Sequence, residues 1–317
     1  MRKKIIILFI IAVIVGTGVW FFRDKTLLRT SSGWKLYSTA CKELLDDNGE
    51  LDTRIYSSFG LGRMKKLTRL EVESLDKYDF LEKLENLEVL NVNINEDHTI
   101  DISKFPEVRS LKELVIFDCD FTEICTEDIS DKMPELESLS FYSCHITDDN
   151  IRDISKCNKI KRILIYGTDE KFYDLYPLTK MDNLEELYLE AYFPDFDLSP
   201  IAEMSKLKVL ECAVYNDEDL KITTLLPSVH KLIIYSNSFF PNCGDDKPEL
   251  PDNYFDELES LEEFSAYSFT ISDNIDISSF PHNLKKMTFV DCNISENVKN
   301  KISESGIEIE VKNNSNY

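Results

Sequence analysis

The stretch "LESLSFYSCHITDDNIRDISKCNK", residues 136–159, contains the pattern that decides the fold of this 317-residue chain. Its first six residues alternate apolar and polar side chains, which predicts a strand with one buried face. Further on, Ile151, Ile154 and Cys157 recur at a spacing of three, which predicts a short helix with one apolar side. Neither element buries its apolar side alone. The stretch therefore predicts one unit of a stacked array.

The leucine-x-x-leucine-x-leucine hexamer that opens this stretch recurs along the chain, beginning at residues 67, 87, 111, 136, 160, 184, 207, 229, 261 and 284. Successive starts are 20, 24, 25, 24, 24, 23, 22, 32 and 23 residues apart. A terminal strand, "IEIEV", is expected at 307–311. A regular period of this length indicates a solenoid. We expect parallel strands on its inner, concave side and short helices on its outer, convex side.

The pattern resembles the leucine-rich repeat family over residues 67–311. That family places an inward asparagine or cysteine three residues beyond the hexamer, a position that holds Asn95, Cys119, Cys144, Thr168, Asn237 and Cys292. Four units depart from it, with Leu75, Tyr192, Tyr215 and Phe269. The stretch "DLSPIAEMSKLKVL" (197–210) resembles bacterial internalin repeats, and "CHITDDNIRDISKCNKI" (144–160) resembles the cysteine-containing repeats of F-box proteins. The resemblance implies an α/β solenoid shaped like a horseshoe.

The N-terminus is different in character. Basic residues 2–4 precede an apolar run from Ile5 to Phe22, which as a helix would span about 27 Å, close to the hydrocarbon thickness of a bilayer. Bulky residues follow the small residues of a candidate cleavage site, so we interpret the run as an uncleaved transmembrane signal anchor of a bacterial protein. A cleaved signal peptide is the alternative. The basic head favours a single-pass protein with the repeat domain extracytoplasmic.

These patterns divide the chain into a basic cytoplasmic head (1–4), the anchor (5–22), a tether (23–33), an N-terminal cap (34–66), the repeats (67–311) and a tail (312–317). The cap is expected to begin with a helix, since apolar residues in "SGWKLYSTACKELLDD" (32–47) follow a helical spacing. The stretch "TRIYSSFG" (53–60) is a candidate edge strand before the first repeat.

Charge and motifs exclude several functions. The net charge is −23, and residues 1–25 hold five basic residues and Asp24, a balance of +4, so the remainder carries −27. Such an acidic surface repels nucleic acids. The sequence contains no phosphate loop, no GxSxG elbow and no HExxH motif. We predict neither an enzyme nor a bound cofactor.

Cys144 and His145 raise the question of a metal site. Zinc needs about four converging ligands, whereas adjacent residues of a strand point in opposite directions. We predict that Cys119, Cys144 and Cys292 are buried structural thiols and that no metal is bound. Because equivalent residues of neighbouring strands lie about 5 Å apart, a Cys119–Cys144 disulfide is the alternative.

The concave face is the candidate binding site. In each unit the third, fifth and seventh residues face it, and these positions carry aligned aromatic residues. We predict that the ligand contacts the exposed rings of Phe117, Tyr142, Tyr166, Tyr188, Tyr235 and Tyr267. The alternative is that strands simply favour aromatic residues. The long unit between the hexamers at 229 and 261 holds an insertion, which either flanks the binding face or is a tolerated surface loop.

The functional prediction is a non-catalytic binding module that engages a protein or cell-envelope ligand through its concave face, and contacts the membrane through its N-terminal helix. A structural or adhesive surface spacer is one alternative. An intracellular adaptor of the F-box-like type is the other.

Overall fold

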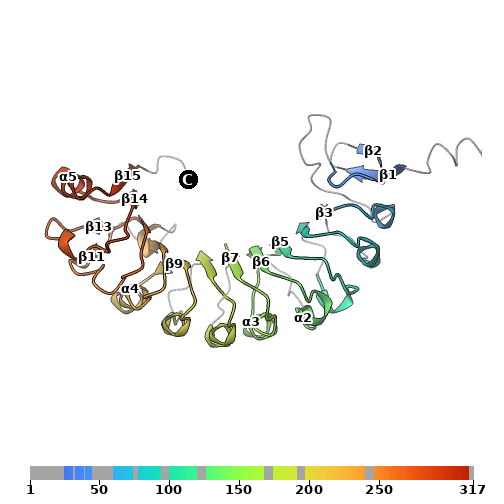
Figure 1. Cartoon of the computed structure of the whole chain (residues 1–317), viewed down its shortest axis with the longest axis horizontal. Helices are drawn as coiled ribbons and strands as arrows, with labels where there is room; N and C mark the ends of the chain where they lie inside the picture. The colour runs from blue at the N-terminus through green and yellow to red at the C-terminus, as the bar shows by residue number, and fades with distance from the viewer. Residues whose placement is uncertain are drawn as a thin grey trace, which may run out of the picture.

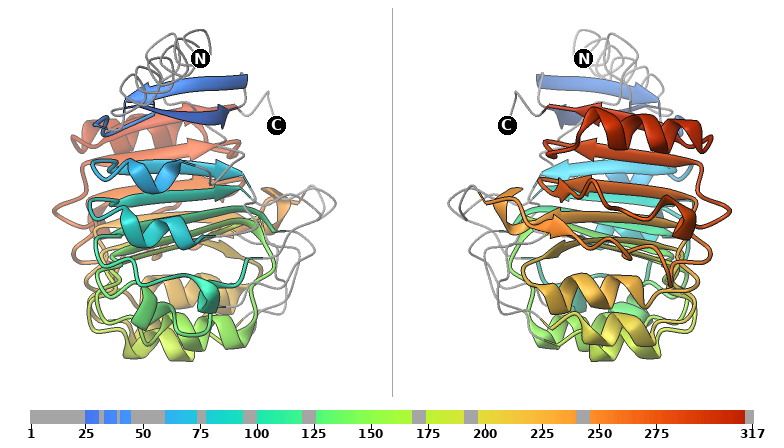
Figure 2. Two further views of the ribbon diagram at one scale, coloured as in Figure 1. Left: turned by 90° about the vertical axis from the view of Figure 1, so that its right-hand side faces the viewer. Right: turned by 90° about the vertical axis from the view of Figure 1, so that its left-hand side faces the viewer.

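The computed structural model describes residues 25–30, 33–38, 40–44, 60–73, 78–93, 100–119, 126–167, 174–190, 197–239 and 246–313. The repeats form an arc in which strands line the inner side and helices lie along the outer side (Figure 1). Views from the two ends of the arc show the strands stacked one above another (Figure 2).

Among the described residues, eleven strands form one parallel sheet in which each strand pairs with the next along the chain. The strands are β3 (Arg69–Glu73), β4 (Val89–Asn93), β5 (Glu113–Cys119), β6 (Ser138–Cys144), β7 (Arg162–Tyr166), β8 (Glu186–Glu190), β9 (Val209–Val214), β10 (Lys231–Ser236), β12 (Glu263–Tyr267), β14 (Lys286–Val290) and β15 (Glu308–Lys312). The predicted solenoid and its strand positions are confirmed. Pairing follows the hexamers residue by residue, as with Leu114, Leu139 and Ile163.

The outer side carries two kinds of short helix. The α-helices are α2 (Ile129–Lys132), α3 (Asp148–Ile154), α4 (Asp217–Thr224) and α5 (Glu296–Glu304). The 3₁₀ helices are η1 (Leu61–Arg63), η2 (Asp79–Lys83), η3 (Ile102–Lys104), η4 (Tyr176–Lys180), η5 (Ser199–Glu203), η6 (Asn237–Phe239) and η7 (Ile277–Ser279). A capping box between Thr147 and Asn150 starts α3.

The start of η5 differs from the sequence pattern. Ser199 followed by Pro200 is typical of a capping residue and a first helical residue, but Leu198 occupies the capping position. The Asp197 carboxylate accepts a hydrogen bond from the Ser199 backbone N–H at 2.8 Å. The helix therefore begins one residue earlier than predicted, because an aspartate further upstream supplies the acceptor.

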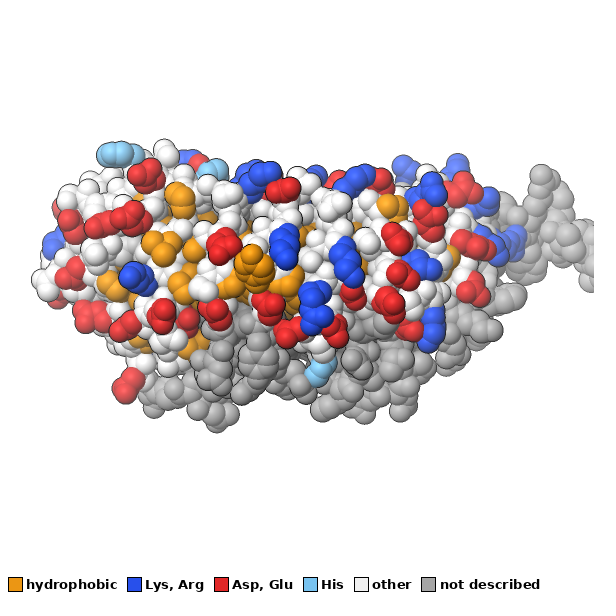
Figure 3. All heavy atoms as spheres, turned by 90° about the horizontal axis from the view of Figure 1, so that it is seen from below, with side chains coloured by type: hydrophobic (Ala, Val, Ile, Leu, Met, Phe, Trp, Pro, Cys, Tyr) orange, Lys and Arg blue, Asp and Glu red, His pale blue; other side chains and the backbone are white. Residues whose placement is uncertain are grey.

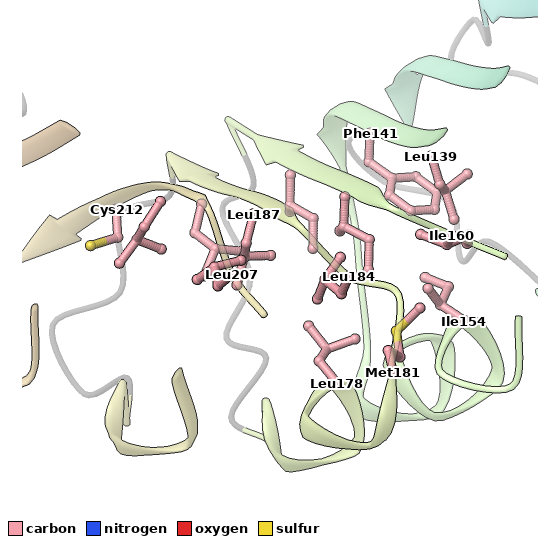
Figure 4. Packing of buried hydrophobic residues seen from close by; sticks show 14 of the residues in the cluster. Leu139, Phe141, Ile154, Ile160, Leu178, Met181, Leu184, Leu187, Leu207 and Cys212 are labelled. Atoms are coloured by element: carbon pink, nitrogen blue, oxygen red, sulfur yellow. The ribbon is translucent and has the colours of Figure 1, made fainter. Parts of the chain in front are cut away.

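The core lies between the sheet and the helices. Leu139 and Phe141 from β6 point toward Ile154 from α3 and Ile160 from the following turn, and all four are fully buried (Figure 4). Similar packing recurs in the next units, where Leu184 lies near Leu178 and Leu187 near Leu207 (Figure 4). Each fully buried leucine stabilises the fold by about 1.5–3 kcal/mol relative to an exposed one. Successive units therefore share one continuous core.

Backbone hydrogen bonds join each unit to the next just before the strands. The Glu137 carbonyl accepts from the N–H groups of Lys161 and Arg162, at 2.8 and 3.2 Å. An equivalent hydrogen bond joins the first repeat to the cap, because the Lys42 carbonyl accepts from the Thr68 N–H at 2.8 Å. Residues 40–44 thus provide the first unit with the neighbour that it needs for capping.

The predicted cap helix is wrong over residues 33–38. Strands β1 (Lys25–Thr30) and β2 (Gly33–Ser38) pair antiparallel instead, so the predicted tether also contains a strand. Trp34, Tyr37 and Cys41 have a spacing close to that of a helix. Cross-strand pairing and burial of Leu28 and Tyr37 against the core outweigh that local preference. The candidate edge strand over 53–60 lies outside the described residues except for Gly60.

The fold-class prediction requires a second correction. It joined the solenoid to a transmembrane helix over residues 5–22, a segment outside the described residues, as is the head over 1–4. Within the part of the chain that the structure describes, no helix is both long and apolar enough to cross a bilayer. The architecture shown is the solenoid of parallel strands and short helices.

The described part of the insertion is not a simple surface loop. Its strand β11 (Glu249–Leu250) pairs in parallel with β13 (Thr270–Ile271). Leu250, Tyr254 and Phe255 are buried, and the rings of Phe255 and Phe264 meet edge to face at 5.0 Å. The insertion therefore extends the core of its unit.

Candidate functional site

The strand register aligns side chains on the concave face into rows. Because alternate residues of a strand point to opposite sides, Phe141 enters the core while Tyr142 faces the concave side. Pairing of β5, β6 and β7 then places Phe117, Tyr142 and Tyr166 side by side. The row that the sequence predicts is present.

Three rings form the first ring cluster, consisting of Phe117, Tyr142 and Tyr166. Phe117 and Tyr142 stack with centroids 4.9 Å apart and planes 14° from parallel. Tyr142 and Tyr166 meet edge to face at 5.5 Å. All three side chains are half-buried, so each ring keeps an exposed surface while its neighbours fix its position.

Three more rings form the second ring cluster, consisting of Tyr235, Phe239 and Tyr267. Their centroids are 4.4 Å apart between Tyr235 and Tyr267, 4.9 Å between Tyr235 and Phe239, and 5.4 Å between Phe239 and Tyr267. Phe239 lies on η6 and was not among the predicted site residues. Its position at the start of the insertion, shortly after β10, could have indicated it in the sequence. Phe239 helps to bury Tyr235, which is 7% exposed and so differs from the exposed ring predicted.

Tyr188 lies apart from both clusters. It occupies the fifth position of its unit, and its hydroxyl donates to Glu186 Oε2 at 3.1 Å. The guanidinium of Arg162 lies 5.2 Å from the centre of the Tyr188 ring. Burial, reinforced by the charge of Glu186, raises the pKa of Tyr188 to about 12. This ring is held by polar partners rather than by other rings.

Glu211 connects the two clusters. Its Oε1 accepts hydrogen bonds from the hydroxyls of Tyr166, at 2.9 Å, and Tyr235, at 2.8 Å. The side chain is only 6% exposed although it belongs to the concave face. The sequence placed Glu211 at a concave position but gave no indication of these bonds, because the tyrosines are 45 and 24 residues away.

The cysteine side chains of the repeats differ chemically from reactive thiolates. Cys144 Sγ donates to the carbonyl oxygens of Ile116 and Tyr142 at 3.5 and 3.2 Å. Cys292 Sγ donates in the equivalent way to the carbonyl oxygens of Ala266 and Val290. Burial raises the pKa of the Cys292 thiol to about 11 and that of Cys157 to about 12. The thiols of Cys157 and Cys292 therefore differ from thiolate nucleophiles and metal ligands, whose pKa is lowered.

Two related predictions concern metal binding and disulfide formation. Within the described residues, no three histidine, cysteine or acidic side chains gather as a metal site would require. The side chain of Cys119 lies outside the description, but Cys144 carries a thiol whose Sγ donates to two carbonyl oxygens, so the alternative Cys119–Cys144 disulfide is not formed.

The outer face offers no comparable row of rings among the described residues. Acidic and basic side chains are interspersed over it, with hydrophobic ones between them (Figure 3). Its exposed large apolar residues include Tyr176, 49% exposed, and Leu225, 46% exposed. The aligned rings therefore distinguish the inner face.

No protein-family model and no curated protein sequence matches the chain. Among solved structures, the chain is similar to an internalin (inlF) from Listeria monocytogenes, with a TM-score of 0.52 and 16% identity over 83% of this chain and 78% of that one. An internalin C2 from the same organism is 17% identical over 79% of this chain and 83% of that one, with a TM-score of 0.34. The first of these likenesses shows the fold alone, and that fold is the leucine-rich repeat solenoid.

Proposed function

We propose that this protein is a non-catalytic binding module whose concave face contacts a protein or cell-envelope ligand. The observation that carries the proposal is the gathering of concave rings from consecutive repeats into two clusters. All of these rings except Tyr235 remain partly exposed.

Physical chemistry favours contact through such rings. Aromatic side chains supply a large contact area while losing little conformational entropy, and they dominate many interface energies. Here stacking already restricts their rotation before a ligand arrives, so less freedom is lost on binding. The clusters extend from β5 to β12, which suits an extended polypeptide or a folded domain better than a small molecule.

The cellular side on which binding occurs is a proposal from the sequence alone. We place the repeats outside the cytoplasm because basic residues 2–4 precede the apolar run over 5–22. Protease added to intact cells should then digest the repeat domain. Protection that persists until the cells are lysed would contradict this location.

The test of binding compares the two faces. Tagged full-length protein from producing cells should retain a partner after cross-linking and purification. The double variant Tyr142→Ala, Tyr166→Ala should retain it at least tenfold less well, because it removes most of the first ring cluster. Tyr176→Ala is the matched control, since it deletes an exposed tyrosine from η4 on the outer face.

The outcomes separate the proposal from the spacer alternative. A spacer predicts that both variants behave like the natural protein. Equal retention by the double variant would therefore remove the ring clusters as the contact surface. Circular dichroism of both variants checks that the solenoid is intact.

A further inference from the structure

A buried carboxylate on an open face of a protein calls for a physical explanation. Glu211 is 94% withdrawn from water, since its exposure is 6%, and an ionised group in such a place is costly unless it is paired. Structural carboxylates normally offset this cost with a salt bridge or with several hydrogen bonds. The burial of Glu211 therefore depends on the partners of its carboxylate.

Among the described residues, one oxygen of this carboxylate has hydrogen-bond partners. Oε1 accepts both tyrosine hydroxyls, from Tyr166 and Tyr235. No described residue donates a hydrogen bond to Oε2, and no described lysine or arginine lies within 4.0 Å of the carboxylate. Cations of the neighbouring repeats are engaged elsewhere, Arg162 with Glu186 at 3.6 Å and Lys231 with Glu263 at 3.3 Å.

The strand register places Glu211 between Tyr188 of β8 and Ile233 of β10. The strand register places Ala213 opposite Tyr235, so a methyl group interrupts the row of rings at this repeat. Tyr166 from one cluster and Tyr235 from the other point their hydroxyls at the same oxygen. A group that binds over Glu211 would therefore meet these tyrosines and the second carboxylate oxygen.

We propose that Glu211 and the flanking tyrosines form a recognition site for an arginine side chain of the partner. A guanidinium stacks on aromatic rings and donates charge-assisted hydrogen bonds to a carboxylate, which are the two interactions that this site offers. The net charge of −23 also attracts a basic partner. This inference rests on the proposed function and names the chemistry of its partner.

The probe is a pair of small molecules, N-acetyl-arginine amide and the neutral isostere N-acetyl-citrulline amide. The full-length protein carries ¹³C-labelled tyrosine rings, and Tyr166→Phe and Tyr235→Phe assign the two relevant signals. The arginine amide should shift both signals in a saturable way, with at least tenfold higher affinity than the citrulline amide. N-acetyl-lysine amide measures whether an ammonium replaces the guanidinium, and equal or tighter lysine binding would overturn the arginine assignment.

Two variants test the carboxylate. Glu211→Gln keeps an oxygen for the two hydroxyls but removes the charge, so it should reduce arginine binding to the citrulline level. Glu263→Gln, which removes a concave carboxylate already paired with Lys231, is the matched control and should change nothing. Should Glu211→Gln fail to fold, Ala213→Leu keeps the charge and places a larger side chain beside Tyr235, and it should also abolish the arginine preference.

Several outcomes overturn the inference: no saturable shift with the arginine amide, equal binding of arginine and citrulline, or an arginine preference that survives Glu211→Gln. Partner capture separates this failure from failure of the proposed function. If Glu211→Gln retains the partner fully while the Tyr142→Ala, Tyr166→Ala variant loses it, the concave binding surface stands and the arginine site falls.

Discussion

At the scale of the residue, β6 shows how one strand serves two purposes. Leu139 and Phe141 are fully buried in the core, whereas Tyr142 is half-buried and stacks on Phe117. The direction of each side chain follows from the strand pleat, and this much is predictable from the hexamer alone. The extent of burial is not, because it depends on neighbours such as Phe239 that come from irregular parts of the chain.

The difference in burial between Leu139 and Tyr142 predicts that truncating them reduces the free energy of unfolding by different amounts. Leu139→Ala should reduce the free energy of unfolding by about 2–5 kcal/mol, because it leaves a cavity in the core. Tyr142→Ala should cost only about 1 kcal/mol, since it removes ring contacts at a partly exposed site. Denaturant titration of both variants measures the difference. Equal costs would mean that Tyr142 is a core residue rather than a contact surface.

The raised pKa values of the buried thiols predict that the protein becomes less stable at alkaline pH. Burial raises the pKa of Cys292 to about 11 and of Cys157 to about 12, while an unfolded chain ionises its thiols near pH 8.5. Above that pH the unfolded state therefore holds fewer protons than the folded state, and stability falls as pH rises through the folded values. The raised pKa of Tyr188, about 12, acts in the same direction.

Two measurements check these thiols. The free energy of unfolding should decrease between pH 9 and pH 11 in denaturant titrations. A thiol reagent at pH 8 should modify Cys157 and Cys212 at least tenfold more slowly in the folded protein than in denaturant. Rapid modification of the folded protein would show that these thiols are not protected by the core.

At the scale of the element, charges alternate along the edge where the strands begin. From Glu88 to Lys208 the second residue of successive units is glutamate or lysine in turn. Ion pairs join Glu137 to Lys161 at 3.0 Å and Glu185 to Lys208 at 2.9 Å. Glu88 and Lys112 make the same contact at 3.2 Å. A single exposed pair contributes little, but the alternation disfavours a shift of one unit against the next.

A charge reversal tests this row. Lys161→Glu would add a glutamate between Glu137 and Glu185, so that three neighbouring units carry one each. It should destabilise the protein by about 1 kcal/mol at low salt. Lys161→Gln, which only deletes the pair, should cost less than about 0.5 kcal/mol. Added salt should shrink the difference, because it screens exposed charges. A difference that is unchanged in 1 M salt would rule out an electrostatic cause.

The N-terminal elements show where local patterns mislead. A hairpin of β1 and β2 replaces the predicted helix, because pairing with residues 25–30 buries Leu28 and Tyr37. Periodicity within residues 32–47 contains no information about that partner strand. The repeats were predictable for the opposite reason, since each strand and its partner carry the same hexamer.

At the scale of the whole molecule, the period of the sequence determined the solenoid, the order of its strands and the direction of the concave side chains. The site was predictable only in outline. The row of rings follows from aligning the units. Glu211, in contrast, connects the clusters by accepting hydrogen bonds from tyrosine hydroxyls two repeats before it and one repeat after it. Such contacts depend on the curvature and on side-chain conformations that no repeat pattern specifies.

The central claim is that the concave ring clusters meet the partner. A photo-reactive phenylalanine analogue placed at Tyr142 and, separately, at Tyr176 tests it most directly in cells that produce the full-length protein. Irradiation should yield a covalent adduct of defined mass from position 142, on the inner face, and none from position 176, on the outer face. An adduct that forms only from position 176, or equally from both, would contradict the account.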